Sequence, residues 1–306
     1  MAALSAANVF GMNEKTATSQ LARGRESARE LLDERSRYRA SGAGLMPLSV
    51  SRRGIVIAEG DSWFHYPGRD VLAVLQDDFR WEVSSVAHFG DNLEDMAYAE
   101  SQMADLCRQL EWIAQRDEVP SAVLLSGGGN DLAGPEFAML LEHDKSSKPG
   151  LNSVISNELI NVRLRDSLLY LVGAIQECSR ETFGTGIPIY VHGYGHPVPD
   201  DRGFMGGWGP LPGPWLGPAF ARKGVHKHDM DRRKEIAREL IDEFNVMLSE
   251  TASLPEAVDL NYVDVRTALD SGSDYRQSWS NELHPTDAGF REVARLLDEA
   301  ITAQPN

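Results

Sequence analysis

Early in its sequence the chain carries a β-branched run that ends in a polar turn, Ile55-Val56-Ile57-Ala58-Glu59-Gly60-Asp61-Ser62-Trp63. The run at 55–58 predicts a strand, because β-branched side chains pack well on a pleated surface. A serine directly after a strand, where a helix starts, would point its hydroxyl into a cleft beside the free N–H groups of that helix. Taken alone, Ser62 is more typical of a helix N-cap.

Four further apolar runs resemble this strand, and helical segments separate them. The runs lie at residues 81–87, 122–125, 187–191 and 258–263. The segments with apolar residues at helical spacing lie at 92–115, 155–178, 229–249 and from 286 onward. Strands that alternate with helices predict βαβ units, and therefore a parallel sheet covered by helices on both faces. In such sheets ligands bind at the carboxyl ends of the strands.

The composition limits the partners and locations to be expected. The chain has 306 residues, 42% of them apolar, and a formal net charge of -16. This charge argues against nucleic acid and anionic lipid as partners, because both attract clustered Lys and Arg. No apolar stretch is as long as a membrane span, and residues 1–12 lack the pattern of a signal peptide. We therefore expect a cytoplasmic protein in which Cys107 and Cys178 are buried free thiols.

Two segments stand apart from the alternating pattern. Residues 1–50 have no strand signal; the part from 13 to 39 is charged and compatible with a helix, and Ser41-Gly42-Ala43-Gly44 closes it. We interpret 1–50 as a helical extension and 51–306 as the main domain. Within that domain, residues 193–224 are rich in Gly, Pro and aromatic residues and are too long for an ordinary connection. Such a segment is often a lid or a binding loop.

Three more polar clusters lie in predicted loops, at 88–92, 127–131 and 281–285. In the first, Gly90 lets the backbone approach a ligand closely. In the second, the side-chain amide of Asn130 could donate to an oxyanion. In the third, His284 could take a proton from a serine and return it to a leaving group, because its pKa lies near working pH. Each cluster alone is also explained by a plain turn or a structural histidine.

Together the clusters resemble, in order and placement, the sequence blocks of the SGNH (GDSL-type) hydrolases. The matching segments, all within residues 54–303, are Gly60-Asp61-Ser62, Gly90, Gly128-Gly129-Asn130-Asp131 and His284. The resemblance implies a three-layer α/β/α fold with a five-stranded, mostly parallel, flavodoxin-like sheet. It makes residues 51–306 the catalytic domain. The chain has no Gly-x-Ser-x-Gly elbow, which disfavours the α/β-hydrolase fold.

The resemblance also implies a role for each matching residue. Ser62 would be the nucleophile and His284 the general base. The N–H groups of Ser62 and Gly90 and the side chain of Asn130 would form the oxyanion hole. No metal and no cofactor would take part.

One position departs from the family pattern. Three residues before the histidine the family has Asp, and this chain has Asn281. An amide can orient an imidazole but cannot stabilise its cation as a carboxylate does. Three explanations are open: Glu282 or another acid supplies the charge, a Ser-His dyad with a backbone carbonyl suffices, or the protein is a weak or lapsed enzyme. We favour the first two together.

Further aromatic residues and histidines are candidates for lining a substrate pocket or for binding a metal. The candidates for the substrate pocket are Trp63, His65, Tyr194, Trp208 and Trp215. Two histidine pairs, His192 with His196 and His226 with His228, lack the Cys or carboxylate partners of a recognisable ligand set. We therefore expect no metal site.

The predicted activity is serine-dependent hydrolysis of an acyl ester through an acyl-enzyme. The enzyme would be esterase- or lipase-like, or a carbohydrate deacetylase, and its substrate a small-molecule or carbohydrate ester. Two alternatives use the same fold: an acyltransferase, in which an alcohol replaces water, and a non-catalytic binding protein. The oligomeric state does not follow from the sequence.

Overall fold

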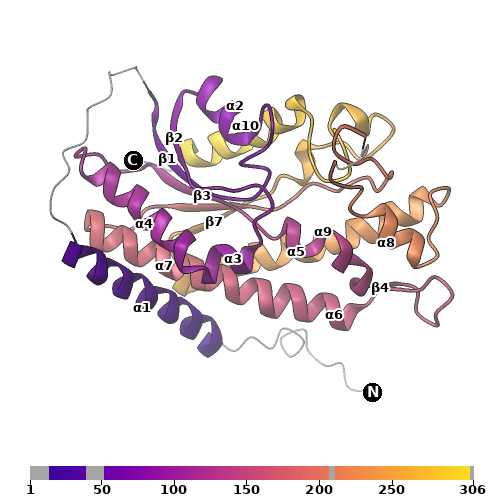
Figure 1. The fold of residues 1–306 in the computed structure, drawn as a ribbon, viewed down its shortest axis with the longest axis horizontal. Coiled ribbons are helices and arrows are strands. Elements are labelled where there is room, and N and C mark those ends of the chain that lie inside the picture. Colours follow the sequence, from indigo (N-terminus) through magenta and orange to yellow (C-terminus); the bar gives the residue numbers. More distant parts are fainter. Residues whose placement is uncertain (1–13, 39–51, 207–210, 304–306) are drawn as a thin grey trace.

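The computed structural model describes residues 14–38, 52–206 and 211–303 (Figure 1). At its centre is a five-stranded sheet in the order β2-β1-β3-β6-β7. All four neighbouring pairs in it are parallel. The strands are β2 (Trp81–Ser85), β1 (Gly54–Gly60), β3 (Ala122–Ser126), β6 (Ile189–His192) and β7 (Leu260–Val263). The predicted five-stranded flavodoxin-like sheet is confirmed, and several strands are shorter than the apolar runs.

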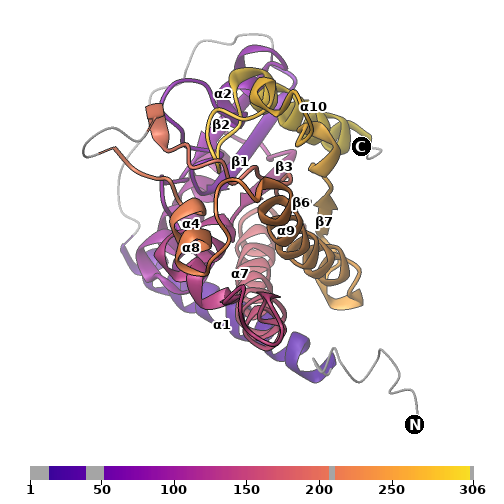
Figure 2. The same cartoon turned by 90° about the vertical axis from the view of Figure 1, so that its right-hand side faces the viewer.

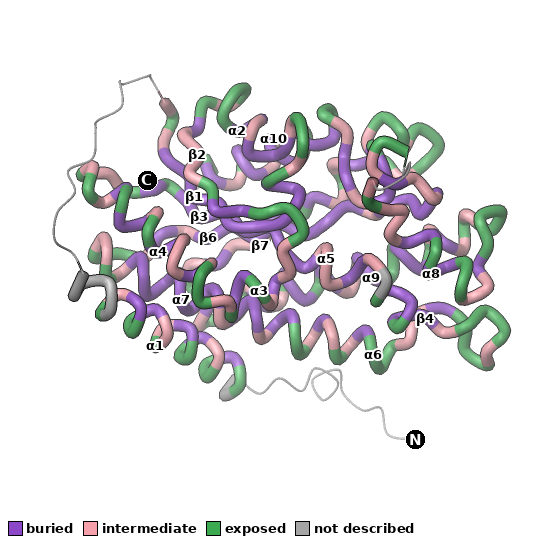
Figure 3. The backbone as a smooth tube through the Cα atoms, viewed as in Figure 1, coloured by how far each residue is buried: buried purple, intermediate pink, exposed green. Residues whose placement is uncertain are grey.

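The middle of the sheet is buried on both faces. Every residue of β3 and β6 is buried, as are the last six of β1, and Figure 3 shows these strands in the interior of the molecule. This is why their sequences are almost continuously apolar and do not alternate with polar residues. The polar residues that do occur lie mostly at the carboxyl ends of the strands.

Helices cover the two faces of the sheet, so the fold has the predicted three layers. On one face lie α2 (Val71–Asp77) and α10 (Asp287–Ala303). On the other lie α3 (Leu93–Tyr98), α4 (Glu100–Ala114), α7 (Arg165–Phe183) and α9 (Met230–Ala252). Figures 1 and 2 show the two groups of helices on opposite sides of the strands.

Two of the predicted helices are interrupted. The segment 92–115 divides into α3 and α4 at Ala99, whose backbone is extended (ψ 113°). The segment 155–178 belongs to a longer helical stretch made of α6 (Ser153–Glu158), a π-helical turn at Leu159–Leu164 and α7. Apolar periodicity continues through both breaks, because the helices on either side turn the same face to the core.

The N-terminal helix α1 (Glu14–Tyr38) lies along the outer side of α7 (Figure 1). The two backbones are so close that a Cβ on Gly24 would come within 1.9 Å of the Tyr170 carbonyl oxygen. Leu21 and Ala28 are buried in this contact. The predicted helix is confirmed over its described part. The closing segment 41–44 lies outside the described residues, and the boundary at residue 50 stays a prediction.

The segment 193–224 contains little regular structure. A 3-10 turn at Phe204–Gly206 and the short helix α8 (Gly217–Arg222) are its elements among the residues described. Phe220 of α8 packs edge-on against Phe137, with ring centroids 5.1 Å apart. The small hairpin of β4 (Leu141–Glu142) and β5 (Gly150–Leu151), which the sequence did not predict, follows Phe137 in the chain.

The expectation for the cysteines was wrong. Cys107 of α4 and Cys178 of α7 form a disulfide between two helices of the same layer. The two residues are 71 positions apart in sequence, and local patterns do not show which helices are neighbours. None of the described helices is long and apolar enough to cross a membrane.

Candidate active site

Ser62 lies in a tight turn directly after β1. The carbonyl of Asp61 accepts the N–H groups of Phe64 (3.1 Å) and His65 (3.0 Å), and the Asp61 carboxylate accepts the N–H of Trp63 (3.0 Å). The next helix, α2, begins only at Val71, so the expectation that Ser62 starts a helix was wrong. The N–H of Ser62 itself donates to no described residue, which leaves it available to a ligand.

His284 is hydrogen-bonded to Ser62 across the end of the sheet. Its Nε2 lies 2.8 Å from the Ser62 Oγ, and its Nδ1 lies 3.0 Å from the Asn281 Oδ1. The Asn281 oxygen also accepts the backbone N–H groups of Leu283 (3.0 Å) and His284 (2.9 Å). Because this oxygen can only accept, Nδ1 carries the imidazole proton, and Nε2 is free to receive the proton of the serine.

The other end of the Asn281 amide is held by Tyr66. The Asn281 Nδ2 donates to the Tyr66 hydroxyl at 3.1 Å. The Tyr66 ring also stacks on the imidazole of His284, with centroids 4.4 Å apart and an interplanar angle of 26°. Tyr66 therefore fixes both the amide and the ring that the amide orients. No sequence pattern indicates this contact, because Tyr66 and Asn281 are 215 positions apart.

Burial without a charged partner lowers the pKa of His284 to about 3. The residue is 2% exposed, and transferring the imidazole cation out of water is costly. His284 is therefore neutral at ordinary pH, as a general base must be. An imidazolium at this position would be correspondingly poorly stabilised.

The structure gives Glu282 a different role from that of supporting acid. Its buried carboxylate accepts four backbone N–H groups of the segment 193–224, those of Asp201 (3.0 Å), Trp215 (2.7 Å), Leu216 (2.8 Å) and Gly217 (3.0 Å). Both ring nitrogens of His284 are hydrogen-bonded to other residues. Burial raises the pKa of the Glu282 carboxyl, and the four N–H groups act against this shift.

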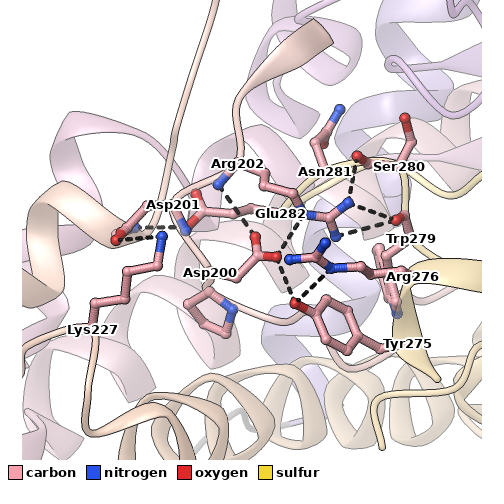
Figure 4. Close-up of polar contacts among 12 residues, drawn as sticks. Asp200, Asp201, Arg202, Lys227, Tyr275, Arg276, Trp279, Ser280, Asn281 and Glu282 are labelled. Carbon is pink, nitrogen blue, oxygen red and sulfur yellow. Dashed lines mark hydrogen bonds and ion pairs between the residues drawn. The ribbon is translucent and has the colours of Figure 1, made fainter. Parts of the chain in front are cut away.

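Arg202 makes a second connection between the segment and the loop before His284. Its guanidinium donates to the carbonyls of Trp279 (3.2 Å) and Ser280 (2.9 Å) and pairs with Asp200 (2.5 Å). Tyr275 donates to the same Asp200 carboxylate at 2.8 Å. Figure 4 shows these groups converging, while the Asn281 side chain points away from them. The loop 279–284 is thus held by the segment on one side and by Ser62 and Tyr66 on the other.

Asn130 lies at the end of β3, and it lines the same pocket as Ser62. It belongs to the short helix α5 (Gly129–Leu132), which begins after Gly128 in the left-handed region (φ 103°). The Asn130 Nδ2 donates to the Asp91 carbonyl at 2.8 Å, and this links the loops after β2 and β3. Its second amide hydrogen is free for a ligand. Gly90 is exposed in the same loop as Asp91, and its part in an oxyanion hole stays a prediction.

Two aspartates, Asp61, which is buried, and Asp131, which is half-buried, support these loops from behind. Asp61 accepts the Ser126 hydroxyl (2.8 Å) and the Tyr194 hydroxyl. Asp131 accepts the N–H of Leu93 at the start of α3 (2.9 Å). Burial raises the pKa of each to about 6. The hydrogen bonds of the two carboxylates indicate a positioning role.

The candidates for the substrate pocket take different places. Trp63 and Tyr194 line a pocket that opens beside Ser62. Trp215 lies against the His284 ring, with centroids 5.3 Å apart, and outside that pocket. His65 is exposed near His88. Trp208 lies outside the described residues. Phe89, which sequence reasoning missed, is half-exposed and stacks towards His284 at 6.1 Å.

The histidines considered for a metal do not form a ligand set. His192 is fully buried, and its Nδ1 donates to the Gly193 carbonyl at 2.6 Å. His196 pairs with Asp242 at 2.9 Å. Within residues 14–38, 52–206 and 211–303, no group of three or more His, Cys, Asp or Glu side chains could hold a metal ion.

Solved structures of the same general architecture include several hydrolases. No protein-family model and no curated protein matches the sequence. A putative SGNH hydrolase from Slackia heliotrinireducens is 15% identical, with a TM-score of 0.43 over 80% of this chain and 97% of that one. Two further structures are similar to the same extent. An acetylxylan esterase from Geobacillus stearothermophilus is 14% identical, with a TM-score of 0.43 over 84% of this chain and 98% of that one. A putative GDSL-like lipase from Parabacteroides merdae is 14% identical, with a TM-score of 0.42 over 84% of this chain and 99% of that one. At these values the likeness concerns the fold alone.

Proposed function

We propose that the protein is a serine-dependent hydrolase of acyl esters, with Ser62 as nucleophile and His284 as general base. One observation carries this proposal: the hydrogen-bonded chain from the Ser62 Oγ through both nitrogens of His284 to the Asn281 Oδ1, at 2.8 and 3.0 Å. Nucleophile, base and orienting group within hydrogen-bond reach are the signature of an activated nucleophile. The buried, neutral imidazole is in the protonation state that a general base requires.

The first half of the reaction forms an acyl-enzyme. The Ser62 Oγ attacks the ester carbonyl carbon while its proton moves to the His284 Nε2. The carbonyl oxygen becomes an oxyanion, for which the Ser62 N–H and the second amide hydrogen of Asn130 are the donors at hand. Collapse of this intermediate breaks the bond to the alkoxy oxygen, and the departing alcohol takes the proton from His284.

The second half repeats these steps with water. His284 removes a proton from a water molecule, whose oxygen attacks the acyl carbon. The bond to the Ser62 Oγ then breaks, the serine recovers its proton from His284, and the carboxylic acid leaves. Each half forms an imidazolium, which Asn281 orients and does not neutralise. The reaction we propose therefore works with a dyad and an amide.

The direct test compares wild-type protein with Ser62→Ala and His284→Ala. We expect p-nitrophenyl acetate hydrolysis to fall about a thousandfold or more in each variant. A fluorophosphonate probe should add its mass to the peptide containing Ser62 in the wild type and in neither variant. Ser101→Ala, at an exposed serine on α4, is the matched control and should keep full activity.

Two outcomes would contradict the proposal. Equal hydrolysis by wild type and Ser62→Ala would show that the serine is not the nucleophile. No hydrolysis and no labelling by a folded wild-type protein would favour the non-catalytic alternative. Adding a short alcohol to the assay separates the acyltransferase alternative, because a transferase yields the new ester faster than the free acid.

A further inference from the structure

The pocket beside Ser62 is lined almost wholly by apolar side chains. Its cavity volume, measured as the space open to the centre of a water-sized sphere, is about 50 Å³, within a larger hollow of about 580 Å³ that includes open solvent. Its walls come from the end of β3, from the segment 193–224, from α9 and from the loop before α10. Six of the lining side chains are Leu132, Phe137, Leu216, Leu240, Ile241 and Trp279, and each is less than a tenth exposed.

The polar groups in this pocket are few and mostly engaged. Asp61 and Tyr194 line it, and they are hydrogen-bonded to each other. Ser62 and Asn130 also belong to the lining. Sugar hydroxyls need hydrogen-bond partners when they are buried, since a buried polar group without one costs free energy. The pocket offers such partners at its reactive end, and its lining also includes the indole N–H of Trp279, which has no hydrogen-bond partner among the described residues.

The position of His284 shows which half of an ester would enter the pocket. The leaving alcohol must lie on the side of the imidazole, because His284 gives it a proton. His284 is surrounded by Tyr66, Phe89 and Trp215, and none of these four residues lines the pocket. Asn130, the candidate oxyanion donor, does line it. The pocket therefore extends from Ser62 on the side away from the leaving group, where the acyl chain lies.

We infer that this pocket is an acyl-chain site and that the substrates are esters of unbranched aliphatic acids longer than acetate. This inference rests on the proposed function, which places the ester carbonyl at Ser62. The alcohol half lies near the half-exposed Phe89 and is less restricted. Acetyl groups on a carbohydrate would leave most of the apolar pocket empty.

The test is the dependence of kcat/KM on acyl length, measured with p-nitrophenyl acetate, butyrate, hexanoate, octanoate and dodecanoate. Each methylene group that enters the pocket should raise kcat/KM by up to roughly fourfold. We expect a rise from acetate to hexanoate or octanoate, and a fall once the chain exceeds the pocket.

Two substitutions narrow the pocket from different walls, Ala237→Met on α9 and Ala133→Leu after α5. Each should move the optimum to a shorter acyl chain. Each should also lower the ratio of kcat/KM for octanoate to kcat/KM for acetate by at least about tenfold, because roughly two methylene groups would no longer fit in the pocket. Val246→Met is the matched control, because it introduces the same side chain at an exposed position of α9. It should leave the profile unchanged.

The results separate this inference from the proposed function. Labelling of Ser62 by the fluorophosphonate probe together with the fastest turnover on acetate would overturn the acyl-chain site and leave the hydrolase in place. An octanoate-to-acetate ratio unchanged in both folded pocket variants would do the same. Absence of labelling and of turnover at every chain length would overturn the proposed function itself.

Discussion

The side-chain oxygen of Asn281 accepts the Nδ1 proton of His284 at 3.0 Å, at the place where the resembled family has a carboxylate. The amide sets the tautomer and the orientation of the ring, as a carboxylate would. It contributes no negative charge, and burial then lowers the pKa of His284 to about 3. The effect of an amide in place of a carboxylate can be measured in the pH dependence of the proposed reaction.

We expect the proposed hydrolase activity of the wild-type protein to persist in acid. Protonated His284 cannot accept the serine proton, and with a pKa of about 3 it is protonated only in strong acid. We expect kcat/KM to be nearly flat from about pH 5 to 8, without the half-point near pH 6.5 of an ordinary histidine. The profile is measured with an ester whose product signal is independent of pH. Asp61, whose pKa is about 6, is the neighbour to control for, with Asp61→Asn.

The substitution Asn281→Asp should convert the site into a charged triad. The new carboxylate can accept the Nδ1 proton, and the Tyr66 hydroxyl, which now accepts from the amide, can donate to it instead. The carboxylate should raise the pKa of His284. The acid limb of the pH profile, where kcat/KM falls at low pH, should therefore move to higher pH. In serine proteases the reverse change costs ~10⁴ in kcat, so we expect kcat at pH 8 to rise at least about tenfold.

The control for this gain is Tyr66→Phe, which removes the hydroxyl and is made both in the wild type and in the Asn281→Asp variant. It should lower the activity of each only modestly, since the hydrogen bond at the His284 Nδ1 stays. A folded Asn281→Asp protein with unchanged kcat and an unchanged acid limb would show that the imidazolium is not formed in the rate-limiting step.

Glu282→Gln should loosen the segment 193–224 without changing the titration of His284. A glutamine offers one acceptor oxygen in place of two, so about two of the four backbone N–H groups lose their partner. Leaving such groups buried costs about 2–4 kcal/mol. We expect a lower melting temperature, faster proteolysis within 201–217 and a lower kcat. A shift of the acid limb would instead identify Glu282 as an acid that supports the base.

The fold was predictable from the sequence where local patterns and topology agree. The apolar run before Ser62 is typical of a buried strand, and the alternation of such runs with helical segments indicated the parallel sheet. The breaks at Ala99 and at the π-helical turn were not visible. Neither break changes which face of the helix is apolar, so the spacing of the apolar residues does not reveal it.

The site was predictable only in part. Ser62 and His284 could be selected because each lies in a polar cluster at a strand end or before a helix. The hydrogen-bond partners of Asn281 and Glu282 could not be predicted, because Tyr66 and the backbone of 201–217 are distant from them in sequence. Glu282 was considered as an acid because it lies two residues before His284. Residues so close together in a loop can point in different directions, and the structure separates their roles.

Glu59→Gln should stabilise the protein at high pH. Glu59 is 1% exposed in β1, and burial, together with the charge of Asp91, raises its pKa to about 9. The folded state therefore keeps a proton that the unfolded chain loses above about pH 4.5. Stability falls as the pH rises through this window, because the folded state binds more protons than the unfolded state. We expect the variant to gain about 2–4 kcal/mol at pH 8 and almost nothing at pH 5. Equal gains at both values in denaturant titrations would contradict this assignment.

The disulfide between α4 and α7 should be present in the purified protein and should stabilise it. Cys107 and Cys178 close a loop of about 70 residues, and the chain entropy that such a crosslink removes from the unfolded state corresponds to about 4 kcal/mol. We expect no reaction with a maleimide under denaturing, non-reducing conditions. We also expect a melting temperature lower by roughly 10 °C after reduction or in Cys107→Ser. The Ser101→Ala substitution at an exposed position of the same helix is the control. Two maleimide-reactive thiols in the unreduced, denatured protein would show that the disulfide does not form.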